Sequence, residues 1–171
     1  AFMRQEEDKH KEYKPDARWL RYRRVLVDWM CEACDEFKLR LTTAHVAVAY
    51  LDRVLHSNTV ERSQLQLVAA VCILIAAKIE EVEYEVPSPS AMCSHTEWAY
   101  SVKEVQDAEF EIIYHLKWSF RTFTPLHFAS YFVYRGVLFE GDTMHGRNVV
   151  RKVPGYLKRF ADFFADLCLQ E

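Results

Sequence analysis

Cys31 and Cys34 are the first residues whose type and spacing could do chemistry. A Cys-x-x-Cys pair can bind zinc or exchange a disulfide, but a structural zinc site needs further ligands at a recognisable spacing. No second Cys-x-x-Cys pair and no nearby histidine accompany these two residues. The pair also lies in a strongly apolar segment that is predicted to be helical, so we expect structural thiols and no metal site.

Other catalytic and cofactor-binding patterns are missing from the sequence. A phosphate-binding loop needs glycines where backbone N–H groups approach the anion, and all four glycines lie at or after Gly136. The seven histidines are scattered, and no nucleophile elbow or pair of catalytic acids stands out. These observations favour a binding module over an enzyme, with no cofactor.

Composition limits the class of protein further. The chain has 171 residues, 50% of them hydrophobic, which suits one compact domain or one domain plus part of another. A net charge of −3 gives no indication of binding to nucleic acid or to an anionic membrane. The longest apolar run, residues 67–77, is too short to span a bilayer, and no signal peptide is recognised. Five cysteines, an odd number, indicate reduced thiols in the cytosol or nucleus.

Apolar residues recur at three- and four-residue steps through most of the chain, which is the pattern of amphipathic helices. Five helices are predicted before a linker, at about 18–38, 42–56, 61–81, 89–94 and 101–118, and helices at about 125–137 and 148–169 begin a second unit. The third helix is apolar on all sides, which indicates a central helix surrounded by the others. Thr42 or Thr43 is expected to cap the second helix.

Four charged residues fall where the apolar stripes would place hydrophobic ones: Arg23, Asp52, Lys78 and Glu109. Burying an unpaired charge is costly, so each must reach a partner or water. The short Asp52 side chain favours an Arg23–Asp52 pair, and elimination leaves Lys78 and Glu109 as candidates for a second pair. The alternative is that Arg23 and Lys78 lie over apolar surface with their charged ends in solvent, Lys78 as a solvated cap. The acidic cluster 80–85 is expected to be a solvated turn, or else to face basic residues of a partner.

Four stretches resemble the strongest segments of the cyclin box, in the order and near the spacing of the cyclin family: RRVLVDWMCEACDEF, AVAYLDRVL, LQLVAAVCILIAAKIEE and AEFEIIYHLKW. The residues that define the box in that family are all present: Arg23, Asp52, Leu67, Lys78 and Glu109. Details such as HVAVAYLD and the ending FADFFADLCLQE look closest to the cyclin J branch. The resemblance implies an all-α cyclin fold, with a five-helix box around a central apolar helix plus the first helices of a second box.

The resemblance also implies a division of the chain into three parts. Residues 1–17 correspond to the remnant of an N-terminal helix and a linker. Residues 18–120 correspond to the first cyclin box, and residues 121–171 to a linker and a partial second box.

Cyclins bind and activate a cyclin-dependent serine/threonine protein kinase, and the resemblance implies the same role here, in the control of cell-cycle progression in the nucleus and cytoplasm. The alternative is a cyclin-fold adaptor that binds a non-kinase partner without activating a kinase, although such adaptors usually lack the lysine–glutamate pair. The kinase-binding residues that the resemblance implies are Lys78, Glu109, Ile79, Ile112, Ile113 and Leu116, with Trp118 beside them. For the apolar members of this set, packing in the core is the alternative.

Many cyclins recruit substrate or inhibitor peptides through a groove on the first helix of the box. The positions that match this groove are Tyr22, Val25, Leu26, Trp29, Glu32 and Gln66. Where the family has methionine and a small alanine, this sequence has Tyr22 and Arg24, which puts the usual Arg-x-Leu peptide preference in question. The alternative is that Leu26 and Trp29 are ordinary core or surface apolar residues.

Overall fold

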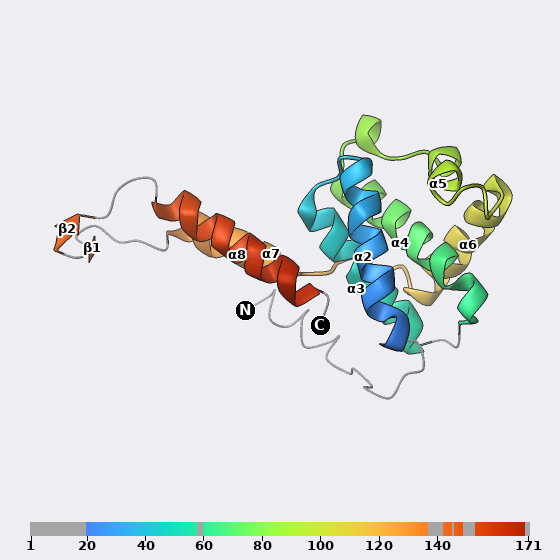
Figure 1. Ribbon diagram of the computed structural model, residues 1–171, viewed down its shortest axis with the longest axis horizontal. Helices are drawn as coiled ribbons and strands as arrows, with labels where there is room; N and C mark the ends of the chain where they lie inside the picture. The colour runs from blue at the N-terminus through green and yellow to red at the C-terminus, as the bar shows by residue number, and fades with distance from the viewer. Residues whose placement is uncertain (1–19, 58–59, 137–141, 145, 149–152, 170–171) are drawn as a thin grey trace.

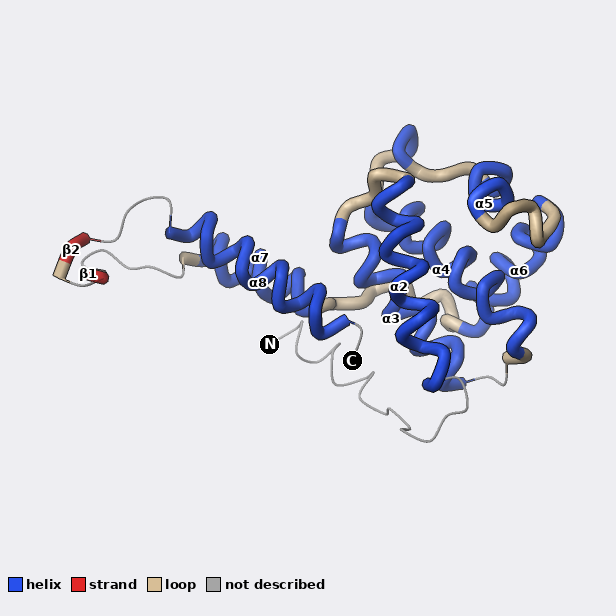
Figure 2. Tube along the Cα trace, viewed as in Figure 1, coloured by secondary structure: helices blue, strands red, loops and turns tan. Residues whose placement is uncertain are grey.

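The computed structural model describes residues 20–57, 60–136, 142–144, 146–148 and 153–169. Residues 1–17, predicted to hold the remnant of an N-terminal helix, lie outside the described residues. Helices make up most of the described chain (Figures 1 and 2). Their bounds are α2 Leu20–Glu36, α3 Leu41–Ser57, α4 Leu65–Glu80, α5 Pro89–His95, α6 Val102–His115, α7 Pro125–Arg135 and α8 Val153–Leu169, with the 3₁₀ turns η1 Arg62–Gln64 and η2 Glu83–Glu85.

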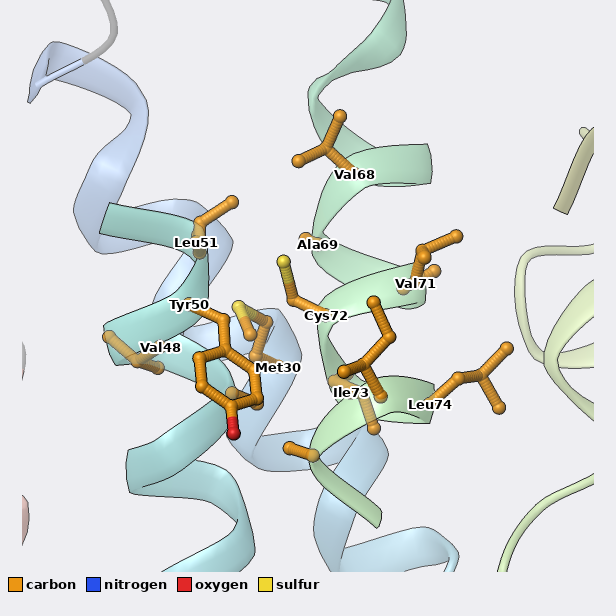
Figure 3. Packing of buried hydrophobic residues seen from close by; sticks show 14 of the residues in the cluster. Met30, Val48, Tyr50, Leu51, Val68, Ala69, Val71, Cys72, Ile73 and Leu74 are labelled. Carbon is orange, nitrogen blue, oxygen red and sulfur yellow. The ribbon is translucent and has the colours of Figure 1, made fainter. Parts of the chain in front are cut away.

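Helix α4 is the centre of the fold, as its apolar sequence predicts. Leu65 and residues 67–77 are buried, and α2, α3, α5 and α6 pack around them (Figure 1). Figure 3 shows Cys72 on the side of α4 that faces Tyr50 of α3 and Met30 of α2. By length and composition the segment Arg62–Glu80 could cross a membrane, but most of it is buried inside the domain. A helix that is apolar on all sides is equally typical of a buried core helix, and this is the environment that the structure shows.

Local sequence signals set the beginnings of three helices. Ser88 precedes Pro89, the first residue of α5, and its Oγ accepts a hydrogen bond from the N–H of Ala91 (3.1 Å). Ser101 and Glu104 form a reciprocal capping box at α6, with each side chain accepting from the other's backbone N–H (3.2 and 2.8 Å). Helix α7 begins at a proline, as predicted.

The predicted start of α3 and the predicted end of α6 are wrong. Helix α3 begins at Leu41, so Thr42 and Thr43 lie in its first turn and neither precedes the helix as a cap. Helix α6 ends before residue 118, because Lys117 and Trp118 adopt positive φ angles of 54° and 56°. These angles lie outside the right-handed helical region.

Helices α7 and α8 lie side by side and extend away from the helices that surround α4 (Figure 1). We call this pair the α7–α8 arm. Strand β1 (Thr143–Met144) pairs with antiparallel strand β2 (Arg147–Asn148) at its far end, so α8 begins at Val153 rather than near residue 148. The arm leaves large apolar side chains exposed, among them Tyr131, Phe132, Phe160, Phe163, Phe164 and Leu167. Apart from this short hairpin, the described chain is helical, and the predicted all-α class is confirmed.

Candidate functional site

Lys78 and Glu109 form an ion pair at the surface of the domain. The Lys78 Nζ, in the last turn of α4, donates a hydrogen bond to Oε1 of Glu109 in α6. The lysine side chain is 45% exposed and the glutamate side chain 14%, so a partner can reach the pair. The helix dipole also favours a cation in the last turn. Lys78 is therefore neither a buried charge nor an unpaired cap.

The packing of α6 on α4 positions this pair. Lys78 is the first exposed residue after the buried run of α4. On α6, Val105 and Ile112 are buried, and they lie four residues before and three residues after Glu109. Glu109 therefore lies on the face of α6 that meets α4, close enough to the exposed end of α4 to pair with the lysine.

Only some of the apolar residues expected beside the pair reach the surface. Ile79 is 50% exposed, Trp118 is 70% exposed and Ile113 is half-buried. Ile112 and Leu116, predicted with them as kinase contacts, are 3% and 1% exposed and belong to the core. We therefore assign these two residues to the support of α6 rather than to a contact surface, because the inner stripe of the helix includes both.

Two exposed aromatic residues of α6, the helix that carries Glu109, are not among the predicted site residues. Phe110 and Tyr114 lie one turn apart on α6, and each is 75% exposed. Their spacing of four residues, outside the inner stripe of the helix, was a signal in the sequence that could have found them.

An open hollow of about 800 Å³ lies beside Ile79. Its walls are the end of α4, the linker of residues 117–123 and His127 of α7. In this linker Trp118 and Phe120 pack edge to face, with ring centroids 6.2 Å apart. The hollow therefore offers an aromatic surface that continues from the exposed isoleucine.

Two residues of α3 hold the linker in place. The Tyr50 hydroxyl donates to the carbonyl of Phe120 (2.6 Å), and the Arg53 guanidinium donates to the carbonyls of Ser119 (2.8 Å) and Leu116 (3.2 Å). Burial raises the pKa of Tyr50, so its hydroxyl stays protonated and remains a donor. Neither α3 residue was predicted to have a role in the site, because their partners lie more than 60 residues away along the chain.

Arg23 and Asp52, the two charges on the apolar stripes of the first two predicted helices, also form an ion pair, as predicted. Nε and Nη2 of the arginine donate to the two carboxylate oxygens at 3.0 and 3.1 Å, a fork that joins α2 to α3. The remaining Nη1 donates to the carbonyl of Leu169 at the end of α8 (2.9 Å). This arginine therefore also fixes the base of the α7–α8 arm.

The residues of the predicted peptide groove separate into three groups by their burial. Leu26 is buried in the core, so it is not part of an open groove. Val25 is 68% exposed, and Glu32 is also exposed. Tyr22 and Trp29 are half-buried at the surface of α2, as is Gln66 at the start of α4.

One residue of the acidic cluster is not solvated. The Glu81 side chain is 1% exposed, and its carboxylate accepts from the backbone N–H and the Nε of Arg40 (both 2.8 Å) and from the hydroxyl of Thr43. Burial acts to raise the pKa of this carboxyl, but the hydrogen bonds from Thr43 and Arg40 outweigh it and lower the pKa. Glu81 thus caps the start of α3, whereas Glu83 and Glu85 are exposed as predicted.

The two cysteines of the Cys-x-x-Cys pair are protonated thiols. Burial is the largest cause that raises the pKa of Cys31 to about 11 and that of Cys34 to about 12. A thiolate is the form that binds metal and attacks disulfides. Among the described residues no group of three histidine, cysteine or acidic side chains is placed to hold a metal ion.

The fold and the surface pair together define a class: an all-helical domain built around one apolar helix, with a lysine–glutamate pair presented at its edge. Residues 2–121 match the family described as "Cyclin, N-terminal domain", and the chain belongs to the cyclin family. The cyclins are regulatory subunits and not enzymes. The prediction of the family is confirmed, and the assignment to the J branch stays a prediction.

Individual relatives support the same family. The chain is 33% identical over 177 residues to a cyclin-D of Ostreococcus tauri, which covers 100% of this chain and 47% of that protein. It is 41% identical over 110 residues to a G1/S-specific cyclin-E of Caenorhabditis briggsae, which covers 63% of this chain and 21% of that protein. The chain thus spans half or less of the length of these relatives. A viral cyclin of herpesvirus saimiri shares its fold, with a TM-score of 0.74 at 18% identity, over 100% of this chain and 72% of the other.

Proposed function

We propose that this chain is a regulatory subunit that binds and activates a cyclin-dependent serine/threonine protein kinase and so helps to control cell-cycle progression. The observation that carries the proposal is the exposed Lys78–Glu109 pair with apolar surface beside it. Charged groups at fixed positions give an interface its register, and the apolar surface supplies the free energy of association. Ile79, Ile113 and Trp118 are the apolar residues that we expect to meet the kinase.

The mechanism that we propose is a shift in the conformational equilibrium of the kinase. A protein kinase is inactive while its helix C and activation loop depart from the catalytic geometry. A subunit that binds only the active arrangement moves the kinase toward it, and a shift from 1:99 to 99:1 requires about 5.5 kcal/mol of differential affinity. A domain packed around one buried helix suits this task, because a preformed surface need not be ordered when the kinase binds.

The test uses the purified chain with a panel of cyclin-dependent kinases. We expect the chain to retain at least one of them in a pull-down and to stimulate phosphorylation of a histone substrate at least tenfold. Retention without stimulation would instead identify a cyclin-fold adaptor. Absence of both retention and stimulation across the panel would refute the proposal.

We also propose that the protein resides in the nucleus and cytoplasm, where a cell-cycle kinase acts. A fluorescent fusion followed by microscopy tests this directly. Confinement to a membrane-bounded secretory compartment would contradict it.

A further inference from the structure

The α7–α8 arm meets the rest of the chain along a loosely packed region. The last part of α8 lies against α3, while the arm extends away from the helices around α4 (Figure 1). We call the region where α8 faces α2 and α3 the seam. Hollows of about 270, 190 and 70 Å³ lie along it, and α8 has no buried residue among those described. Protein interiors leave few voids larger than a water molecule, so the seam is packed less tightly than the core.

Arg23 and His45 are polar residues that reach α8 across the seam. Nη1 of Arg23 donates a hydrogen bond to the carbonyl of Leu169 (2.9 Å). Nε2 of His45 lies 4.0 Å from Oδ1 of Asp166, which is too far for a hydrogen bond. Of these two residues, therefore, the arginine binds α8 and the histidine only faces it.

Two buried polar atoms at the seam have no hydrogen-bond partner among the described residues. One is Nε2 of His45, whose side chain is 1% exposed. The other is Oδ1 of Asp162 in α8, although its second carboxylate oxygen accepts from Lys158 (2.6 Å). A buried polar group without a partner costs free energy, and exposure to water removes this cost. Both atoms therefore favour a state in which α8 has moved away from α3.

The imidazole of His45 is held neutral by its surroundings in the docked arm. The charged and titratable groups that face it or line the same hollow are Asp162, Asp166 and Cys168 of α8, His127 of α7, Arg23 of α2 and Asp52 of α3. Burial is the largest cause that lowers the pKa of His45, and His127 adds to it. Asp166 and Asp162 oppose this effect but do not outweigh it.

We propose that the seam is a pH-sensitive latch: the α7–α8 arm is docked on α3 while His45 is neutral, and it is released when His45 takes up a proton. Protonated histidine carries an N–H donor on both ring nitrogens. In the docked arm Nε2 is buried without a hydrogen-bond acceptor, whereas release opens it to water. The latch needs no kinase, so it does not depend on the proposed function.

Proton uptake favours the released arm. With the arm released, His45 meets water and its pKa returns to the ordinary value of about 6.5. Because the pKa is lower in the docked arm, the released form binds the proton more tightly, and acid shifts the equilibrium toward release. One proton can raise the ratio of released to docked arm by at most about tenfold per pH unit, below about pH 6.5.

Double electron–electron resonance measures the position of the arm in the full chain. Two ketone-bearing amino acids carry the spin labels, one in place of Lys103 in α6 and one in place of Tyr156 in α8, both exposed positions. We expect one main distance at pH 7.5. A second population should grow at least threefold between pH 7.5 and pH 5.5, while the helical circular dichroism signal stays unchanged.

Variants of single side chains assign the effect to His45. His45→Leu and His45→Gln cannot take up the proton, so their distances should not change with pH. His56→Gln, the same change at a histidine in the last turn of α3, should keep the pH dependence of the wild type. Asp166→Asn removes a charge that opposes the lowered pKa, so release should be more complete at pH 5.5.

Several outcomes would overturn the latch. One is a distance distribution that is the same at both pH values. Another is a distribution that narrows in acid, because protonated His45 would then pair with Asp166 and tighten the seam. A third is a His45→Leu variant that keeps the pH dependence of the wild type. Loss of the helical signal at the pH where the arm moves would also overturn it, because the arm would then leave by global unfolding.

Discussion

Arg23 hydrogen-bonds both carboxylate oxygens of Asp52, and its third nitrogen bonds the last turn of α8. The two side chains are 12% and 23% exposed, so this pair is partly buried rather than a surface ion pair. One guanidinium thus joins the consecutive helices α2 and α3 to the α7–α8 arm, where its partner Leu169 lies 146 residues later in the chain. Stability and the position of the arm depend on the same group.

Removing one member of this pair should destabilise the fold. We expect Arg23→Ala or Asp52→Ala to lower the free energy of unfolding by about 3 kcal/mol, because the remaining charge is left without its partner. Arg23→Lys keeps the charge but loses the fork, so its effect should be intermediate. Urea denaturation measures all three variants. A loss below about 1 kcal/mol for both alanine variants would place the pair with ordinary surface ion pairs.

The Lys78–Glu109 pair should matter for kinase activation and little for folding. Exposed ion pairs contribute about 0–1 kcal/mol, so Lys78→Ala and Glu109→Ala should unfold close to wild type. Each variant should lower kinase stimulation at least tenfold. Lys103→Ala, at an exposed position of α6, the helix that also carries Glu109, should not lower it. Kinase assays and urea denaturation on the same samples separate the two effects.

An exchange of the two residues distinguishes contact from support. The double variant Lys78→Glu with Glu109→Lys keeps an ion pair between α4 and α6 but reverses what a partner meets. We expect it to fold and to remain inactive. Restored stimulation would show that the pair only holds the two helices together.

Trp118 should contribute strongly to kinase affinity, because large exposed aromatic residues are frequent hot spots of interfaces. Trp98 is a matched control, since it is 62% exposed with φ of 59°, against 70% and 56° for Trp118. We expect Trp118→Ala to weaken kinase binding at least tenfold and Trp98→Ala to leave it within twofold. Equal effects of both variants in a titration would remove Trp118 and its hollow from the proposed contact.

His45 should make stability depend on pH. Its side chain is 1% exposed, and among the described residues its Nε2 has no hydrogen-bond partner and lies 4.0 Å from Oδ1 of Asp166. Burial is the largest cause that lowers its pKa, His127 of α7 adds to this, and Asp166 and Asp162 of α8 oppose it. The lowered pKa means that the unfolded chain takes up a proton near pH 6.5 while the folded chain does not.

Stability should therefore fall as pH drops below about 6.5, by at most about 1.4 kcal/mol per pH unit for this one proton. His45→Leu should remove that part of the slope. Urea denaturation of the wild type and the variant between pH 7.5 and 5 measures the difference. If stability depends on pH in the same way in the variant, or if the wild type gains stability on acidification, then the lowered pKa of His45 is not the cause.

Periodicity and charge placement predicted the helices, the central position of α4 and the Arg23–Asp52 pair, and they left Lys78 and Glu109 as candidates for a second pair. These features are local, because a helix stripe has a fixed period and a charge on that stripe needs a partner. The same reasoning could not separate Ile112 and Leu116 from Ile113. All three lie near one stripe, and only the angle at which α6 meets α4 decides which of them is covered.

The features that were missed depend on tertiary contacts. Glu81 stands in a run of acids and looks solvated, yet its carboxylate lies against Arg40 and Thr43, about 40 residues earlier in the chain. Tyr50 has the apolar spacing of a core residue, and nothing in its neighbourhood indicates that its hydroxyl holds the linker. Buried polar groups such as the Glu81 carboxylate and the Tyr50 hydroxyl are expected to find hydrogen-bond partners, but the sequence does not say which ones.

The hydrogen bond from Arg23 to the end of α8 also influences where the hairpin lies at the other end of the arm. A 17-residue helix is about 25 Å long, so a rotation of about 10° where it is held displaces its far end by about 4 Å. The position of β1 and β2 therefore depends on the angle at which Arg23 holds the end of α8.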